Sequence, residues 1–420
     1  MFAYHAATRH SWQSVRAHSN YLEWEKQPVP FKIYNDFLDM IALDDADPVH
    51  RMLYRIGGIT AKKVYPGTEY YLRTIPSAGA LYPVEFYIQI RDVAGLEDGI
   101  YHFDVRNSAL KLLHRLGLEE GVESLFSDRR MVRGFLFLLS TIYYRSSWKY
   151  KKRAFRYCLL DAGHGLGTIE ASSYLYGHAA NIRYRFDKPA LNEAFGFGYK
   201  EFFLSAVMVG APTDARASWL DLSLPDINPP IEREELIETA YVDSLALYAC
   251  HAQRRYVPFG YDAGRFEEVI YQRRSAREFR GEAISRASLD AILGKLSLPI
   301  LSDCDEPVHI YYVVNRVEGM APGLYLNGKL LREGDFSQKA GYLCLEQALG
   351  SESAVTFFLT SGSANYQAAY QKAGMIGHRL YLASGYLGIG CSGIGAYYDD
   401  ETAAFLQTDE MILYALAIGA

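Results

Sequence analysis

The sequence predicts an α+β protein in which one structural unit occurs twice along the chain. Residues 84–88 (VEFYI) resemble residues 308–312 (VHIYY), and the Gly-x-Tyr turn at 99–101 recurs at 323–325. The two segments of each pair are separated by the same long stretch of sequence, which indicates a duplicated domain rather than a short solenoid repeat. The chain also lacks regular strand–helix–strand alternation with a glycine-rich phosphate loop, which argues against a doubly wound parallel sheet.

Each copy is expected to contain the same elements in the same order. A strand comes first, because β-branched and aromatic residues alternate there. A glycine turn, a second short strand and helices follow, and a long buried helix and a closing strand complete the copy. The expected bounds in the two copies are 84–91 and 308–315 for the first strand, about 157–177 and 367–388 for the long helix, and 203–209 and 411–417 for the closing strand.

Shifts in composition predict four regions along the chain. Residues 212–235 are rich in Pro, Asp and Ser and are expected to form a linker, and a helix is expected over about 232–254. The predicted regions are an N-terminal extension that wraps the core at 1–50, a first domain at 51–211, the linker and helix at 212–258, and a second domain at 259–420.

Length and charge disfavour several classes of protein. The 420 residues suffice for two domains, and 43 basic against 49 acidic residues give a net charge of −6, which argues against a nucleic-acid-binding surface. The longest apolar run, 134–144, is too short to cross a bilayer, and the polar N-terminus lacks the apolar core of a secretory signal. A cytoplasmic protein is therefore expected. The 34 tyrosines suit a large interface or a pocket for a planar ligand.

The five cysteines are widely spaced and form no Cys-x-x-Cys motif. Their odd number and spacing disfavour a structural zinc site, a disulfide framework and a thioredoxin-type motif. Reduced thiols, with no metal site, are therefore expected at Cys158, Cys250, Cys304, Cys344 and Cys391.

A basic segment, Arg273-Arg274-Ser275-Ala276-Arg277, opens the second copy. Three guanidinium groups and a hydroxyl within five residues are suited to binding a phosphate, because arginine offers forked donors and serine a short one. Such clusters are also common at solvated helix ends, and the residues alone leave this alternative open.

The segment 76–83 (PSAGALYP) runs directly into the first strand. Pro76 and Pro83 fix the backbone at both ends, and the small residues between them let a planar group approach and leave backbone N–H groups free to donate. An ordinary loop that enters a strand is the alternative.

A basic and aromatic cluster precedes the long helix of the first copy. Lys149 and Tyr150 are candidates for a proton-transfer pair, since burial and neighbouring cations lower the pKa of a lysine and a tyrosine can donate or relay a proton. A basic helix start in solvent is the alternative. Asp161 and His164 lie on one helical face, where a core or capping role is favoured over catalysis.

The second copy carries a glycine-rich segment at 388–395. It does not follow the Gly-x-Gly-x-x-Gly pattern after a strand, so a dinucleotide-binding fold is only weakly indicated.

Together these segments resemble the nitroreductase-fold flavoproteins, and within them the SagB-type branch that includes the thiazoline/oxazoline (azoline) oxidases, in a tandem-duplicated form. The resemblance covers most of residues 50–210 and 262–415. In that family two copies of the fold pack as an intimate dimer and bind FMN at their interface, which implies that this chain is an intramolecular pseudo-dimer. The segments that carry the resemblance are PSAGALYP at 76–83, WKYxxRxxRY at 148–157, DAGH at 161–164, RRSAR at 273–277 and GIGCSGIG at 388–395.

The resemblance implies a division of labour in FMN binding. The basic segment would hold the phosphate and ribityl chain, and the 76–83 loop would cover the isoalloxazine ring. The first copy has no RRSxR segment before Leu53, and the second has no PSAGALYP pattern at 298–304. One FMN site completed within the chain and one degenerate site are therefore expected. The implied cofactor-binding residues are Pro76, Ser77, Ala78, Gly79, Leu81, Arg273, Arg274, Ser275, Arg277, Gly390, Gly393 and Ile394.

The resemblance also implies a chemistry. Lys149 and Tyr150 match the Lys-Tyr pair linked to azoline oxidation, in which a base takes the Cα proton of a thiazoline or oxazoline while a hydride leaves Cβ for flavin N5. An aromatic azole is the product, and dioxygen reoxidises the flavin. The expected protein is an FMN-dependent dehydrogenase/oxidase of natural-product biosynthesis. Its substrate would be a small molecule, a peptide or a carrier-bound group, with other biosynthetic enzymes as candidate partners and no nucleic acid or membrane.

Two alternatives stay open. The first is an NAD(P)H-dependent nitro, quinone or enone reductase, which the Lys-Tyr pair disfavours because a simple reductase needs no positioned base. The second is a non-catalytic partner of a modifying complex that binds little flavin. Consumption of NAD(P)H and uptake of added FMN separate these alternatives from the oxidase.

Overall fold

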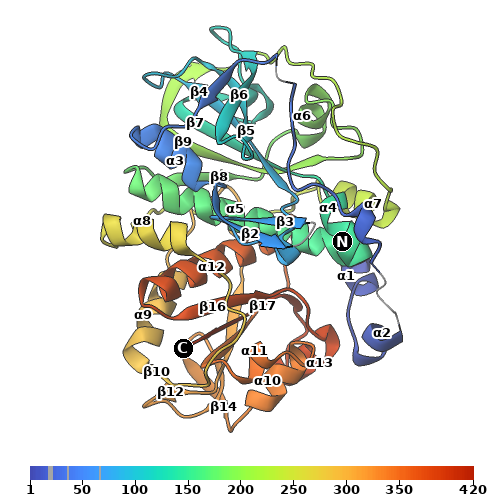
Figure 1. Cartoon of the computed structure of the whole chain (residues 1–420), viewed down its shortest axis with the longest axis vertical. Coiled ribbons are helices and arrows are strands. Elements are labelled where there is room, and N and C mark those ends of the chain that lie inside the picture. Colours follow the sequence, from blue (N-terminus) through green and yellow to red (C-terminus); the bar gives the residue numbers. More distant parts are fainter. Residues whose placement is uncertain (18–21, 36, 66–67) are drawn as a thin grey trace. The chain divides into compact units, whose positions relative to one another are not determined.

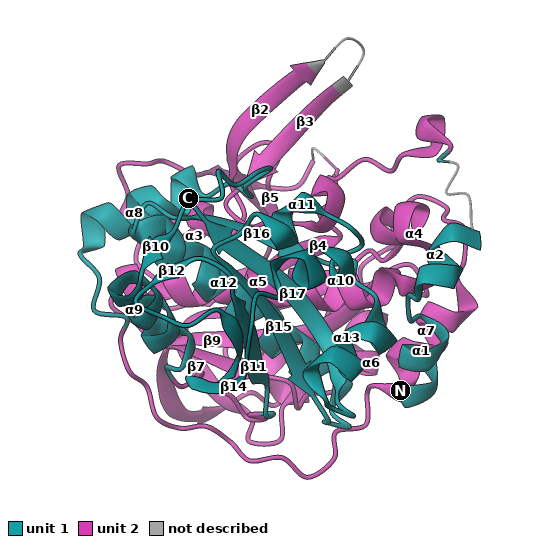
Figure 2. Cartoon of the chain, turned by 90° about the horizontal axis from the view of Figure 1, so that it is seen from below, with its two compact units in different colours: residues 1–22, 259–298, 306–420 teal, residues 23–258, 299–305 magenta. Residues whose placement is uncertain are grey.

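The computed structural model describes residues 1–17, 22–35, 37–65 and 68–420. The chain divides into two compact units, and each unit is built from more than one stretch of sequence (Figure 2). Unit 1, teal in Figure 2, comprises Met1–Leu22, Phe259–Leu298 and Glu306–Ala420, and unit 2, magenta, comprises Glu23–Pro258 and Pro299–Asp305.

An antiparallel sheet of seven described strands forms the centre of unit 2 (Figure 1). The strand order is β1-β6-β5-β4-β7-β9-β8. The central β4 is buried along its whole length, and its polar residues Glu85, Gln89 and Arg91 are paired with Arg145, Glu123 and the carbonyl of Glu120. The bounds are β1 Met40–Ala42, β4 Val84–Arg91, β5 Gly99–Asp104, β6 Ala109–Arg115, β7 Arg130–Thr141, β8 Ala180–Arg183 and β9 Phe202–Arg216.

The long helix of unit 2, α5 (Ala154–Leu175), is buried over 154–173. Its small residues let it approach the sheet closely: a Cβ on Gly165 would lie 3.0 Å from Leu139 of β7 and 3.1 Å from Phe86 of β4. The other helices of this unit are α3 Pro48–Arg55, α4 Tyr144–Tyr150, α6 Lys188–Ala194 and α7 Glu235–Asp243. A separate hairpin consists of β2 Ile59–Tyr65 and β3 Thr68–Arg73, and 3-10 turns lie at Trp24–Lys26, Ala78–Ala80, Val122–Leu125 and Lys151–Arg153.

Unit 1 has an antiparallel sheet of six described strands in the order β14-β13-β11-β15-β17-β16. Its strands are β11 His309–Val314, β13 Gly323–Leu326, β14 Lys329–Glu333, β15 Val355–Ser361, β16 Gly390–Ile394 and β17 Met411–Gly419, with a small parallel pair of β10 Ile284–Ser285 and β12 Val317–Glu318. Its helices are α1 Phe2–Ala7, α2 Trp12–Ala17, α8 Ala263–Gln272, α9 Arg286–Leu296, α10 Ser337–Leu343, α11 Ala348–Ser351, α12 Tyr366–Tyr386 and α13 Asp399–Leu406.

The two sheets repeat one topology. The order β6-β5-β4-β7-β9-β8 in unit 2 corresponds strand for strand to β14-β13-β11-β15-β17-β16 in unit 1. The long helix precedes the edge strand in both cases, as α5 before β8 and α12 before β16. The matching segments found in the sequence are therefore equivalent elements of two like sheets, and the expected α+β class is confirmed.

The N-terminal helix α1 packs within unit 1, against the copy that comes last in the sequence. The ring of His5 is buried, with its Nδ1 3.3 Å from the hydroxyl of Tyr366. The backbone N–H of His10 donates to Asp399 at 2.8 Å, and Arg9 forms an ion pair of 2.9 Å with Asp400. Residues near the start of the chain thus complete the second copy.

Two expectations about the connection between the copies are wrong. The helix expected over 232–254 is shorter, because α7 ends at Asp243 and the chain beyond it is drawn into a disulfide and a β-bridge at Gln253. The linker expected from 212 begins later, because β9 continues to Arg216 alongside the long β7. In the described part of the chain, no helix has the length and apolar character needed to span a membrane.

Candidate functional site

The basic segment 273–277 leaves α8 and runs beside β16 within unit 1. The α8 helix ends at Gln272, and Arg273 adopts an extended conformation that turns the chain out of the helix. The N–H of Ala276 donates to the carbonyl of Cys391 at 2.9 Å. The structure therefore brings together two of the predicted cofactor-binding segments, the basic segment and β16, which are far apart in sequence.

Tyr381 of α12 holds these two segments in place. Its hydroxyl lies 2.8 Å from Ser275 Oγ and accepts a hydrogen bond of 2.6 Å from the N–H of Gly393. The ring of Tyr381 lies under the guanidinium of Arg273, 5.3 Å from ring centroid to Cζ. Burial raises the pKa of Tyr381 to about 12, so its hydroxyl keeps its proton at neutral pH.

The arginines of the basic segment differ in exposure. Arg273 is buried beside Tyr381, whereas Arg274 and Arg277 are exposed. Arg274 and Arg277 thus lie at the protein surface, and Arg274 Nη1 also donates to the carbonyls of Tyr271 and Arg273 at 3.2 and 2.6 Å.

The predicted residues of β16 contribute backbone more than side chains. A Cβ on Gly393 would collide with the hydroxyl of Tyr414, and a Cβ on Gly390 would lie 3.5 Å from Ala276. Ile394 is buried in the hydrophobic core of unit 1, so its backbone is the part suited to contact a ligand. The glycines therefore let neighbouring side chains, Tyr414 and Tyr381 at Gly393 and Phe279 and Ala276 at Gly390, pack directly against the backbone of β16.

The 76–83 loop contains three residues with left-handed backbone conformations. Gly79, Ala80 and Tyr82 have φ angles of 66°, 54° and 46°. Gly79 is exposed at the crest of the loop, whereas Pro76, Leu81 and Tyr82 are buried. Non-glycine residues in this region cost on the order of 1–3 kcal/mol each, so the surrounding side chains must hold the loop.

Lys149 and Tyr150, at the end of α4, approach the crest of this loop. A Cβ on Gly79 would lie 2.8 Å from Tyr150 Oη and 3.4 Å from Lys149 Nζ. The ring of Tyr150 packs on Tyr157 at 4.3 Å between centroids. Burial, followed by the charges of Tyr157 and Asp161, raises the pKa of Tyr150 well above its usual range. The hydroxyl of Tyr150 therefore keeps its proton at neutral pH.

Asp161 of α5 binds the first part of the 76–83 loop through hydrogen bonds. Its carboxylate accepts hydrogen bonds from Ser77 Oγ at 2.5 Å and from the N–H of Ala78 at 3.3 Å. Burial raises the pKa of Asp161 to about 7, although the bonds from Ser77 and Ala78 oppose the rise. The sequence indicated a core or capping role for this residue, and the structure shows what it holds.

The last part of the loop is held by buried charges. Arg145 Nη1 donates to the carbonyl of Tyr82 at 2.8 Å and forms an ion pair of 2.6 Å with Glu85. His102 contacts Glu85 at 2.9 Å. Burial alone would raise the pKa of Glu85, but Arg145 and His102 outweigh it and lower this pKa to about 2.

The edge strand β8, the counterpart of β16, is covered by the chain itself. Residues 299–305, which precede the first strand of the second copy, belong to unit 2 and run beside β8. The N–H of Ile182 donates to Leu301 at 2.9 Å, and the N–H of Asp303 returns a bond of 3.1 Å to Ile182. The outer edge of β8 is therefore paired with residues 299–305, whereas the basic segment 273–277 runs beside β16.

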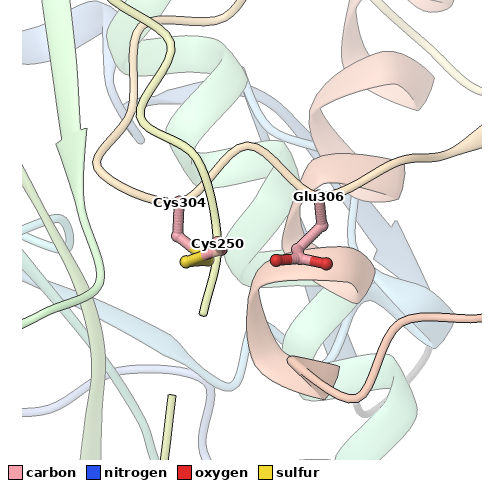
Figure 3. A group of neighbouring side chains, drawn as sticks. All are labelled: Cys250, Cys304 and Glu306. Carbon is pink, nitrogen blue, oxygen red and sulfur yellow. A yellow bond between two sulfur atoms is a disulfide. The ribbon is translucent and has the colours of Figure 1, made fainter. Parts of the chain in front are cut away.

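A disulfide fastens this covering segment to the chain beyond α7. Cys250 and Cys304 are joined, with their Cα atoms 5.2 Å apart (Figure 3). The expectation of five reduced thiols is therefore wrong at these two positions. The paired cysteines lie 54 residues apart, so only the fold brings them together. Cys158, Cys344 and Cys391 are buried free thiols.

Tyr381 and Arg145 are the supporting residues that the sequence did not single out for a role in the site. Each acts on a predicted segment from a distant position: Tyr381 on the basic segment and β16, and Arg145 on Tyr82. A buried polar residue on the helix that follows or precedes a candidate loop would have been the signal. That signal is weak, because many such residues only satisfy the core.

Comparison with known proteins bears on both the fold and this site. Residues 270–420 match the family model described as the nitroreductase family. This last part of the chain is therefore similar to that family. The matched region includes the basic segment 273–277, Tyr381 and β16.

The nitroreductase fold extends over the whole chain. A crystal structure described as that of a "putative nitroreductase" from Anabaena variabilis is similar with a TM-score of 0.82 and 25% sequence identity. The match covers 100% of this chain and 98% of that one. The expected fold is therefore confirmed for the first copy as well as for the second.

Two curated relatives match shorter stretches of sequence. "Putative nitroreductase MJ1384" of Methanocaldococcus jannaschii is 31% identical over 116 residues, which are 24% of this chain and 59% of that protein. The "Trifolitoxin-processing protein TfxB" of Rhizobium leguminosarum bv. trifolii is 28% identical over 147 residues, 33% of this chain and 37% of that protein. The chain thus spans less than two thirds of the length of each relative.

Proposed function

We propose that this protein is an FMN-dependent dehydrogenase/oxidase that tailors a natural product, and that it oxidises an azoline or a related peptide-derived group. The observation that carries the proposal is the approach of Lys149 and Tyr150 to Gly79 at the crest of the 76–83 loop. A reductase that only passes electrons between soluble partners has no need for a lysine and a tyrosine at that position.

The basic segment 273–277 and the adjoining β16 are suited to the phosphate end of FMN. Arg274 and Arg277 are exposed, and the segment that carries them is hydrogen-bonded to β16 through Ala276 and Cys391. Guanidinium groups and a serine hydroxyl make strong, charge-assisted bonds to phosphate. Arg273, Arg274, Ser275 and Arg277 would therefore hold the phosphate and ribityl chain.

The 76–83 loop, with Lys149 and Tyr150 beside it, is suited to the ring of the cofactor and to the substrate bond that is oxidised. FMN, when bound, supplies an acceptor for the hydride that leaves the substrate. The exposed crest of the 76–83 loop allows a planar ring to approach, and the Nζ of Lys149 and the hydroxyl of Tyr150 lie beside that crest. Lys149 would take the Cα proton of the substrate. Tyr150, which burial keeps protonated, would donate a hydrogen bond to the azoline ring that loses this proton.

A role in natural-product processing is supported by one relative. TfxB is named for the processing of trifolitoxin, and its resemblance to this chain favours a modifying enzyme over a general detoxifying reductase. We propose a small, peptide or carrier-bound substrate, with other biosynthetic enzymes as partners in the same cell.

Cofactor stoichiometry and the basic segment test the proposal. We expect one FMN per chain, because only one basic segment and one PSAGALYP loop occur. In Arg274→Ala/Arg277→Ala two charge-assisted contacts, each worth about 1.5–3 kcal/mol, are lost, so FMN affinity should fall roughly 10²–10⁴-fold. Arg280→Ala, an exposed arginine just beyond the segment, is the matched control and should bind FMN normally.

Fluorescence titration and denatured-protein flavin analysis give the two readouts. Two FMN per chain, or full retention in the double variant, contradicts the arrangement. Rapid NAD(P)H oxidation by the holoenzyme without any azoline substrate favours the reductase alternative.

A further inference from the structure

The 76–83 loop is attached at both ends by side chains of unit 2, and the two attachments are of different kinds. At its end, Arg145 and Glu85 form a buried ion pair that fixes the carbonyl of Tyr82. At its start, the single carboxylate of Asp161 accepts both Ser77 Oγ and the N–H of Ala78. The first half of the loop therefore depends on one group.

Ser77 connects the two halves of the loop. Its Oγ donates to Asp161 and accepts a hydrogen bond of 2.9 Å from the N–H of Tyr82. This bond folds the loop back on itself and lifts Gly79 to the crest. Because Ala80 and Tyr82 adopt left-handed conformations that oppose this shape, the loop should relax when the bonds at Ser77 are lost.

We propose that Asp161 is a positioning residue: its carboxylate sets the conformation of the 76–83 loop and thereby places Gly79 against Lys149 and Tyr150. This inference rests on the proposed function for what the loop then does, but not for how the loop is held. Asp161 does not reach the crest itself, and it acts through Ser77 and Ala78.

The surroundings of Asp161 make its charge state matter. The carboxylate of Asp161 accepts hydrogen bonds from Ser77 and Ala78 of the loop, and burial and the charge of this carboxylate both raise the pKa of Tyr150 and of Cys158. Both of its oxygens accept a hydrogen bond, which a carboxylate does better than a carboxylic acid. The pKa of about 7 means that the loop should be held more firmly above neutral pH than below it.

Amide hydrogen exchange tests the inference without any cofactor or substrate. In Asp161→Asn one acceptor oxygen is replaced by an amide nitrogen, so the amides of Ala78 and Tyr82 should exchange at least ~10-fold faster than in the wild type. Ser77→Ala should produce the same change, and Ser77→Thr, which keeps the hydroxyl, should restore slow exchange. Ser172→Ala is the matched control, since Ser172 lies on the same helix and bonds to Met52 instead.

Two further readouts separate positioning from a general loss of structure. After correction for intrinsic rates, protection of the same two amides in the wild type should rise with pH around 7, and Asp161→Asn should abolish that dependence. With FMN added, Asp161→Asn should shift the visible flavin spectrum while Ser172→Ala does not. Melting temperatures check that each variant is folded.

The outcomes are distinct from those that test the proposed function. Unchanged exchange at Ala78 and Tyr82 in Asp161→Asn and Ser77→Ala overturns the inference, whether or not the protein binds FMN. If the amides of Ala78 and Tyr82 exchange faster in Asp161→Asn but the flavin spectrum does not change, the claim that Asp161 places the loop against the cofactor is overturned. Failure of the wild type to bind FMN refutes the proposed function and leaves the exchange experiment to decide the role of Asp161.

Discussion

Ser275 and Tyr381 share a hydrogen bond of 2.8 Å between their hydroxyl oxygens, although 106 residues separate them in the sequence. Tyr381 also accepts the N–H of Gly393, so one phenol fixes the distance between the basic segment and β16. The position of the basic segment relative to β16 is therefore set from the long helix α12, not from the segment alone.

Tyr381→Phe should weaken FMN binding without unfolding the protein. The change removes two hydrogen bonds that each contribute about 0.5–1.5 kcal/mol, and we expect the FMN dissociation constant to rise roughly 5–100-fold. Tyr386→Phe, the same change at the exposed end of α12, is the control. Fluorescence titration measures both, and equal affinities in the two variants would show that Tyr381 does not set the site.

Lys149→Ala and Tyr150→Phe should separate cofactor binding from chemistry. Neither residue belongs to the basic segment, so both variants should keep bound FMN, while substrate-driven flavin reduction should fall by about 10²–10⁴-fold. The two losses should be far from additive if the residues act as a unit. Anaerobic stopped-flow reduction with an azoline substrate is the measurement.

Lys151→Ala provides the comparison for this pair, because Lys151 is the exposed neighbour of Tyr150. It should leave the reduction rate unchanged. Wild-type rates in Lys149→Ala and Tyr150→Phe would remove both residues from the mechanism and return the site to the reductase alternative.

The Cys250–Cys304 disulfide should be detectable and stabilising. Thiol titration of the denatured, unreduced protein should find three free thiols, those of Cys158, Cys344 and Cys391. Reduction should lower the free energy of unfolding by about 2–4 kcal/mol, measured in urea with and without dithiothreitol. The Cys250→Ser/Cys304→Ser variant should show no response to dithiothreitol, and five titratable thiols in the wild type would contradict the pairing.

Acid should destabilise unit 2 through Glu85. The pKa of Glu85 in the folded protein, about 2, lies below its ordinary value of 4.5. Its contribution to stability is therefore complete above about pH 4.5 and is lost as the pH falls toward 2. The shift corresponds to about 3 kcal/mol.

Urea unfolding between pH 6 and pH 2.5 measures this contribution. The wild type should lose more stability over that range than Glu85→Gln, which has no proton to gain at this position. Glu97→Gln, a change at an exposed carboxylate, should follow the wild type. Parallel losses in the wild type and Glu85→Gln would assign the acid sensitivity to other groups.

The sequence was sufficient to predict the elements that repeat. The strands at 84–91 and 309–314 and the long helices α5 and α12 were expected within a few residues of their bounds, because alternation and buried helical runs are local properties. The duplication was visible for the same reason, since both copies keep the strand and turn that open the sheet.

What the sequence could not reveal are the relationships between distant residues. Asp161 and Ser77 lie 84 residues apart, and nothing near Asp161 indicates that its carboxylate receives a loop. Cys250 and Cys304 pair only because residues 299–305 leave unit 1 to cover β8. The early end of α7 was missed because the spacing of apolar residues does not show where contacts with distant parts of the chain end a helix.

The interleaving of the two units constrains the order in which the chain can fold during synthesis. Residues Met1–Leu22 emerge before unit 2 but belong to unit 1, whose strand β17 emerges after unit 2. These first residues must therefore wait, unpaired, while unit 2 assembles around β4 and β7. Unit 2 in turn keeps the edge of β8 open until residues 299–305 arrive. Such an edge is a site for unwanted strand pairing, so slow translation between residues 210 and 305 would favour aggregation over correct folding.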